Sequence, residues 1–313
     1  MTNETLTQET REERATRMRG ETLEAIASAQ VMRTRNPQHE VVLVVDDNYA
    51  QNARGLANAN RSIIPAYDFE TASQALNEAS PNVVLTDIEF QRSLEPGTDI
   101  SPEEQASLER QRVGFFRGIT DKIKTRFEGR EERIHELDSY ASKLYRPGRE
   151  IEFTKKRGNE LAEELQTRGV NYGLVMVDMC QRRQIPYAVV TSINHGNVAP
   201  GLVALGVCAE QELATKLGRY KALRDNAFNS GENIHEATEQ VKNLKETIGK
   251  AIFVGHAGCS RDGEKGKDLP IWQEAYQLAT GKSPTDIPVE SKVENPGTQR
   301  GFFSRVRDYF ARE

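Results

Sequence analysis

The chain contains three short apolar runs, and each of them ends on an acidic or hydroxyl residue. The runs cover residues 41–45, 83–86 and 187–190. The polar residues that close them are Asp46 and Asp47 for the first, Asp87 for the second, and Thr191 with Ser192 for the third. Runs of this length are typical of strands buried on both faces of a parallel sheet. Because ligands bind outside the carboxyl ends of such strands, these side chains are expected to meet in one crevice.

Clustered carboxylates beside a hydroxyl favour one kind of chemistry. Mg²⁺ is a hard cation that prefers oxygen ligands, and phosphoryl transfer depends on positioning and charge neutralisation more than on covalent chemistry. The pattern therefore predicts a site for a divalent cation and a phosphoryl group. The alternative is that Asp46, Asp47 and Asp87 are ordinary turn or cap residues, and that Thr191 and Ser192 cap the next helix.

The order of the expected elements predicts a layered α/β domain. Strand candidates alternate with helix candidates along residues 41–90 and again along 170–280. Such alternation is typical of a parallel sheet with helices on both faces. We expect a doubly wound parallel sheet of five strands, formed by residues 41–45, 63–67, 83–86, 187–190 and 251–254.

An inserted helical hairpin is expected at about residues 95–168. Apolar residues recur there at three- and four-residue steps: Ile119, Ile123, Phe127, Ile134, Leu137 and Leu144. This spacing indicates an amphipathic helix, and Pro147-Gly148 is expected to turn the chain into a shorter return helix. The apolar stripe is expected to pack on the parent sheet or on its own partner helix. The alternative is a dimerisation or effector surface.

Composition shifts divide the chain into four segments: a polar N-terminal tail (1–38, a fraying helix or disorder), the α/β domain with its insertion (39–280), a flexible linker (281–300) and an amphipathic C-terminal helix (301–313). The last segment has aromatic residues on one expected face and arginines elsewhere. Such a helix suits a membrane surface or a protein partner, or it folds back on its own domain.

Composition also argues against several classes of protein: nucleic-acid binding, disulfide-rich, secreted and membrane-spanning. The formal net charge of -5 over 313 residues argues against a dedicated nucleic-acid surface. The three cysteines, Cys180, Cys208 and Cys259, are odd in number and widely spaced, so no disulfide framework is expected. We find no apolar signal-peptide core, and no run approaches the roughly 20 apolar residues that span a bilayer. A soluble cytoplasmic protein in a reducing environment is expected.

Four segments in order resemble the receiver domain of response regulators. They are Val41–Asn48, Phe69–Leu76, Pro81–Asp87 and Ile185–Ser192. The 40 residues that separate Asp47 from Asp87 are close to the usual interval in that family. The resemblance covers residues 41–90 and 170–195 and does not extend well to the rest of the chain.

The resemblance implies a role for each site residue. Asp87 would accept a phosphoryl group from a phosphohistidine or a small phosphodonor, and Mg²⁺ would be held by Asp46, Asp47 and Asp87. Thr191 would donate its hydroxyl to a phosphoryl oxygen. Its inward movement would shift the neighbouring helix and strand. A histidine kinase or phosphotransfer protein would act upstream, as in two-component phosphorelays. The chain carries no recognisable DNA-binding module, so a protein partner would read the signal through the insertion or the C-terminal helix.

The sequence departs from the receiver pattern in three places. Receivers carry a Lys-Pro pair at the end of the fifth strand, and this lysine pairs with the phosphoryl group. No Lys-Pro follows the expected fifth strand here, and Lys267, in a glycine-rich region, is our choice for that lysine. Gln91 stands where the family usually has a proline. The interval between Asp87 and Thr191 is 104 residues instead of about thirty, because the expected insertion lies between them.

Two other functions remain open. A phosphohydrolase similar to the haloacid-dehalogenase family would use Asp46 as nucleophile and Asp262 or Asp268 for Mg²⁺, but Asn48 stands where that family usually has a second Asp. A degenerate receiver would act as a docking scaffold without phosphate. His195, His256 and Cys259 are expected near the same edge of the sheet, although His256 and Cys259 alone are too few ligands for a soft-metal site.

Overall fold

A computed structural model describes residues 10–90, 102–142, 171–192, 198–229, 245–254 and 267–282. All of these residues belong to one compact unit of the chain. The expected linker from residue 283 onward, the C-terminal helix 301–313 and the turn at Pro147-Gly148 lie outside the described residues. No helix in the described part is long and apolar enough to cross a membrane.

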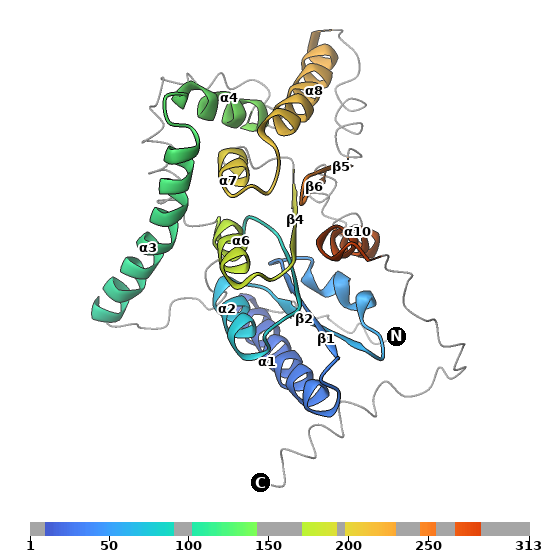
Figure 1. The fold of residues 1–313 in the computed structure, drawn as a ribbon. Coiled ribbons are helices and arrows are strands. Elements are labelled where there is room, and N and C mark those ends of the chain that lie inside the picture. The colour runs from blue at the N-terminus through green and yellow to red at the C-terminus, as the bar shows by residue number, and fades with distance from the viewer. Residues whose placement is uncertain are drawn as a thin grey trace, which may run out of the picture. The chain divides into compact units, whose positions relative to one another are not determined.

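The centre of the fold is a six-stranded, mostly parallel sheet with the order β2-β1-β3-β4-β6-β5 (Figure 1). The strands are β1 (Glu40–Val45), β2 (Arg61–Ala66), β3 (Val83–Thr86), β4 (Tyr187–Ser192), β5 (Lys245–Ile248) and β6 (Ala251–Val254). Every pair is parallel except β5 with β6. The prediction of a five-stranded, all-parallel sheet is therefore wrong at one edge. The polar Lys-Glu-Thr of β5 gave no apolar run to recognise, because this short edge strand is mostly solvent-exposed.

Both faces of the sheet are covered, which explains the continuous apolar runs of its inner strands. Along β1, Val41, Leu43 and Val45 belong to one buried cluster, whereas Val42 and Val44 belong to the other. This alternation follows from the period of two along a strand. All five of these side chains are fully buried.

The helices divide between the two faces. On one face lie η1 (Ala50–Leu56) and α10 (Leu269–Thr280), which bury small and aromatic side chains against the second cluster. On the other lie α2 (Phe69–Glu78), α6 (Tyr172–Arg183) and α7 (Ala199–Ala204). The longer α8 (Glu210–Asn229) adds Leu213 and Leu217 to this first cluster.

The N-terminal region differs from the expected tail, because residues 11–35 form helix α1 (Arg11–Arg35). Thr10 and Glu13 make a capping box at its start, an arrangement that satisfies two free backbone N–H groups. The buried Thr22 donates its hydroxyl hydrogen to the carbonyl of Pro65 in β2. Helix α1 thus lies along β2, an edge strand of the sheet, where an unpaired edge would otherwise invite association.

The insertion contains α3 (Pro102–Arg126) and α4 (Glu131–Ser142). The chain breaks between them at Gly129, whose φ of +73° favours glycine. This break within the expected long helix was not predicted. All the described residues of the apolar stripe, from Ile119 to Leu137, are buried against helices of the parent domain. The stripe was expected to pack on the parent sheet or on a partner helix, whereas the described part of the insertion packs on the helices α6, α7 and α8.

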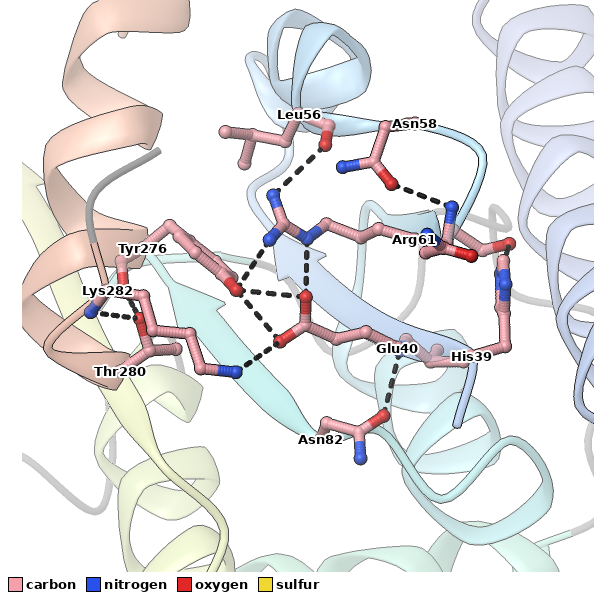
Figure 2. Close-up of polar contacts among 12 residues, drawn as sticks. His39, Glu40, Leu56, Asn58, Arg61, Asn82, Tyr276, Thr280 and Lys282 are labelled. Carbon is pink, nitrogen blue, oxygen red and sulfur yellow. Dashed lines mark hydrogen bonds and ion pairs between the residues drawn. The ribbon is translucent and has the colours of Figure 1, made fainter. Parts of the chain in front are cut away.

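A polar network holds the amino ends of β1 and β2 to the carboxyl end of α10 (Figure 2). Arg61 donates to Glu40 at 2.6 Å and to the Tyr276 hydroxyl at 2.6 Å, and its guanidinium lies 4.0 Å from the centre of the Tyr276 ring. The Tyr276 hydroxyl donates in turn to Glu40. Because all three side chains find partners, this buried network fixes α10 against the sheet.

Candidate metal and phosphoryl site

Asp46, Asp47 and Asp87 lie together at the carboxyl edge of the sheet. Asp46 follows β1 directly and Asp87 follows β3, and these two strands are paired so that Val45 lies opposite Thr86. One carboxylate oxygen from each of the three residues lies within 4.8 Å of the other two. Asp46 and Asp87 are buried, and Asp47 is partly exposed. The expected convergence of these carboxylates is therefore observed, and the cluster could bind a metal ion.

Backbone amides fix one oxygen of each buried carboxylate. Asp46 Oδ1 accepts hydrogen bonds from the backbone N–H groups of Asn48 at 2.9 Å and Tyr49 at 2.7 Å. Asp87 Oδ1 accepts one from the backbone N–H of Ile88 at 2.6 Å. The turn-forming chemistry of the Asp-Asp-Asn sequence is thus present, and it orients the carboxylates instead of replacing their role in the cluster.

Lys267 brings a positive charge to the other oxygen of each carboxylate. Its Nζ lies 2.7 Å from Asp46 Oδ2 and 2.5 Å from Asp87 Oδ2. The Lys267 side chain is only 8% exposed, so the ion pairs lie where water screens them weakly. The two carboxylates raise the pKa of this ammonium, against the lowering effect of burial. Lys267 is therefore charged in the site.

Asp47 is held differently from its two neighbours. Its Oδ1 accepts a hydrogen bond from Asn48 Nδ2 at 2.7 Å. Burial, together with the negative charges of Asp46 and Asp87, raises the pKa of Asp47 to about 7, and Lys267 partly opposes this rise. Near neutral pH this carboxyl group is poised between its protonated and ionised forms.

The raised pKa of Asp47 predicts a pH-dependent stability. Between the ordinary carboxyl pKa near 4 and the folded value of about 7, the folded state binds more protons than the unfolded state. The contribution of Asp47 to stability should therefore be fully present below about pH 4 and be lost as the pH rises through 7. In chelated buffer, Asp47→Asn should gain stability relative to the wild type over this interval, as measured by urea denaturation at successive pH values. A difference that does not change with pH would contradict the assignment.

The charges of the cluster fit a divalent cation. With all three carboxylates ionised, Lys267 neutralises one negative charge, and two remain at oxygen ligands of the type that Mg²⁺ prefers. Burial and the repulsion from Asp46 and Asp87 raise the pKa of Asp47, and a bound cation would relieve this repulsion. The donor set is therefore suited to a hard divalent ion and not to a soft metal.

The amino end of α6 presses against the backbone next to Asp87. The N–H of Gly173 donates to the carbonyl of Ile88 at 3.0 Å. A Cβ at Gly173 would lie 2.1 Å from the carbonyl oxygen of Asp87 and 2.4 Å from the Cα of Ile88. Only glycine permits this approach. Gly173 could not be recognised from the sequence, because a glycine at a helix start has no distinctive signal in a single sequence.

Thr191 lies near the end of β4, the strand that pairs with β3. It is 1% exposed, and its Oγ1 has no hydrogen-bond partner among the described residues. A buried hydroxyl without a partner is costly in a protein interior. Within the described part of the chain, the Thr191 hydroxyl thus stands without a partner on the strand next to β3, while its proposed contact with a phosphoryl group stays a prediction.

Some of the other candidate residues lie in the described part of the chain, and others lie outside it. Asp268 caps α10 by accepting from the backbone N–H of Ile271 at 3.3 Å, and it is not part of the carboxylate cluster. Four residues lie outside the described part of the chain: His195, His256, Cys259 and Asp262. Cys180 and Cys208 are buried free thiols, and burial raises the pKa of each to about 12.

Comparison with protein-family models, with curated proteins and with solved structures gives no match for this chain.

Proposed function

We propose that this protein accepts a phosphoryl group on Asp87 and that Asp46, Asp47 and Asp87 hold the divalent cation that this reaction needs. The observation that carries the proposal is the convergence of three carboxylates with the buried Lys267 ammonium at the carboxyl edge of a parallel sheet. This combination of negative ligands and one fixed positive charge is what phosphoryl transfer to a carboxylate requires.

The topology supports the proposal. The five parallel strands have the order β2-β1-β3-β4-β6, which is the order of doubly wound sheets of the flavodoxin and receiver type. The helices also divide as such a sheet requires, with η1 and α10 on one face and α2, α6 and α7 on the other (Figure 1). The site lies beside the point where the strand order reverses, between β1 and β3.

The chemistry follows from the two oxygens of Asp87. Oδ1 is held by the N–H of Ile88, so Oδ2 is the oxygen that attacks phosphorus. A new bond forms between Oδ2 and phosphorus, the bond between phosphorus and the donor breaks, and the donor leaves with that electron pair. Lys267 exchanges its contact with Oδ2 for one with a phosphoryl oxygen. A bound Mg²⁺ supplies additional neutralisation of the phosphoryl charge.

The predicted output is a change at the surface next to Asp87. The backbone of Asp87 and Ile88 contacts the start of α6, and α3 of the insertion packs on α6. A phosphoryl group on Asp87 would add negative charge at this junction. We propose that the insertion transmits this change to a protein partner.

The test is the intact mass of the protein after incubation with Mg²⁺ and acetyl phosphate. The wild type should gain one phosphoryl group and Asp87→Asn should gain none, because the amide is not a nucleophile of the required kind. Glu89→Gln, which removes a neighbouring carboxylate outside the cluster, serves as the control and should still be labelled.

Each alternative predicts a different result. Labelling that persists in Asp87→Asn would reject Asp87 as the acceptor. Turnover of a generic phosphate ester that is lost in Asp46→Asn would favour a phosphohydrolase. The absence of both labelling and turnover would reject phosphoryl chemistry and favour a docking scaffold.

A further inference from the structure

The Lys267 backbone is held by two side chains that come from different elements. Its carbonyl oxygen accepts a hydrogen bond from Asn52 Nδ2 at 3.0 Å and another from Trp272 Nε1 at 3.1 Å. A carbonyl oxygen has two lone pairs, and both are used here by side-chain donors. Trp272 is fully buried and Lys267 is buried, so the bond from Trp272 lies in the interior of the domain. Asn52 is exposed, and its bond is partly buried.

One donor links Lys267 to the segment that carries two of the carboxylates, and the other links it to the helix that follows it. Asn52 lies on η1, which follows the turn that carries Asp46 and Asp47. Trp272 lies in the first turns of α10, whose first residues contain a proline and whose N-cap is Asp268, the residue next to Lys267. The far end of α10 is fixed by Tyr276 (Figure 2). Helix α10 thus provides a rigid support for Lys267, which lies just before its N-cap.

From this arrangement we infer that Asn52 and Trp272 are positioning residues, which aim the Lys267 ammonium at Asp46 and Asp87. Lysine has a long side chain with several rotatable bonds, and fixing it carries an entropic cost. A backbone that is fixed at the Lys267 carbonyl leaves only the side chain to be ordered. This inference deepens the proposed function, because it explains how a lysine outside any strand reaches the site.

The first test measures the accessibility of Lys267 and does not depend on the proposed function. The protein is acetylated briefly with acetic anhydride, and modification of each lysine is quantified by peptide mass spectrometry. Asn52→Ala and Trp272→Phe, which remove the two donors, should raise the acetylation of Lys267 about three- to tenfold, in line with the coupling energies of neighbouring groups. Acetylation of Lys122, which is 42% exposed, should not change.

Tyr276→Phe is the matched control for loss of stability. It removes one buried hydrogen-bonding group from the same helix, but this group contacts Glu40 and Arg61 and not Lys267. It should lower the melting temperature without raising the acetylation of Lys267. If Tyr276→Phe raises this acetylation as much as the other two variants do, general loosening explains the effect and the positioning role is rejected.

The second test is a double-mutant cycle on the affinity for Mn²⁺, measured by calorimetry. A loosened Lys267 competes less well for the carboxylates, so Asn52→Ala and Trp272→Phe should each bind Mn²⁺ about three- to tenfold more tightly than the wild type. In a Lys267→Met background the same substitutions should have no effect. An equal effect in both backgrounds would overturn the inference.

The two tests separate this inference from the proposed function. If the wild type does not bind Mn²⁺, the proposed cation site is rejected, while the acetylation result still decides whether Asn52 and Trp272 position Lys267. Unchanged acetylation of Lys267 in both variants would reject the positioning role even if Mn²⁺ binds. If Trp272→Phe fails to fold, Asn52→Ala decides the acetylation test alone.

Discussion

Replacement of Lys267 by methionine is expected to lower the free energy of unfolding by about 3–5 kcal/mol in chelated buffer, which is the range for breaking a buried ion pair. Methionine fills nearly the same volume but leaves Asp46 and Asp87 without their cation. These side chains are 1% and 11% exposed, so water solvates their charges poorly. Urea denaturation of the variant and the wild type at pH 7.5 and without divalent ions measures the difference, at a pH above the raised pKa of about 7 of Asp47.

The same substitution should make the protein depend on divalent ions. Because a competing positive charge is gone, Mg²⁺ should bind the three carboxylates more tightly and restore much of the lost stability, as mass action requires for a ligand of the folded state. Lys122→Met is the control, since Lys122 is exposed and its ion pair with Asp178 is expected to contribute about 1 kcal/mol or less. A Lys267→Met protein that is as stable as this control without ions would contradict the account.

The second large effect is expected at Gly173. Alanine usually stabilises a helix relative to glycine by about 0.8–1 kcal/mol, but Gly173→Ala should instead destabilise the protein by about 1–3 kcal/mol or more. The added Cβ would meet backbone atoms of Asp87 and Ile88, which cannot rotate away as a side-chain tip can. The helix or the Asp87 loop must move, so phosphoryl acceptance and Mn²⁺ affinity should fall together with the melting temperature.

Gly20→Ala is the matched control for this prediction. Gly20 lies within α1, and a Cβ at this position would meet nothing within 4 Å. The substitution should therefore stabilise the protein by up to about 1 kcal/mol. Opposite signs for the two glycines are the expected result, and stabilisation by Gly173→Ala would show that α6 does not press on the Asp87 loop.

The sheet and its acidic edge were predictable because they rest on local patterns. The runs that became β1, β3 and β4 are buried on both faces, so nearly all of their residues are apolar. The carboxylates directly follow two of these strands, and parallel pairing brings strand ends together. From such a pattern the convergence of Asp46, Asp47 and Asp87 follows without knowledge of tertiary contacts.

The supports of the site were not predictable, because they depend on contacts between distant parts of the chain. Asn52 and Lys267 are 215 positions apart, and neither lies in a recognisable motif. The sequence around Trp272 indicates only a core residue. That its N–H donates to the Lys267 carbonyl becomes evident only in the structure. The polar composition of α1 likewise concealed the few residues that it buries along β2, among them Met18 and Thr22.

The proposed function depends on a divalent cation that Asp46, Asp47 and Asp87 hold together. The most direct measurement is an anomalous-difference map from crystals of the protein soaked in Mn²⁺. We expect a peak within coordination distance of oxygens from all three carboxylates, with Lys267 displaced from at least one of them. A map with no peak there, and with Lys267 still spanning Asp46 and Asp87, would show that the lysine is the permanent counter-ion of this cluster and would contradict the claim.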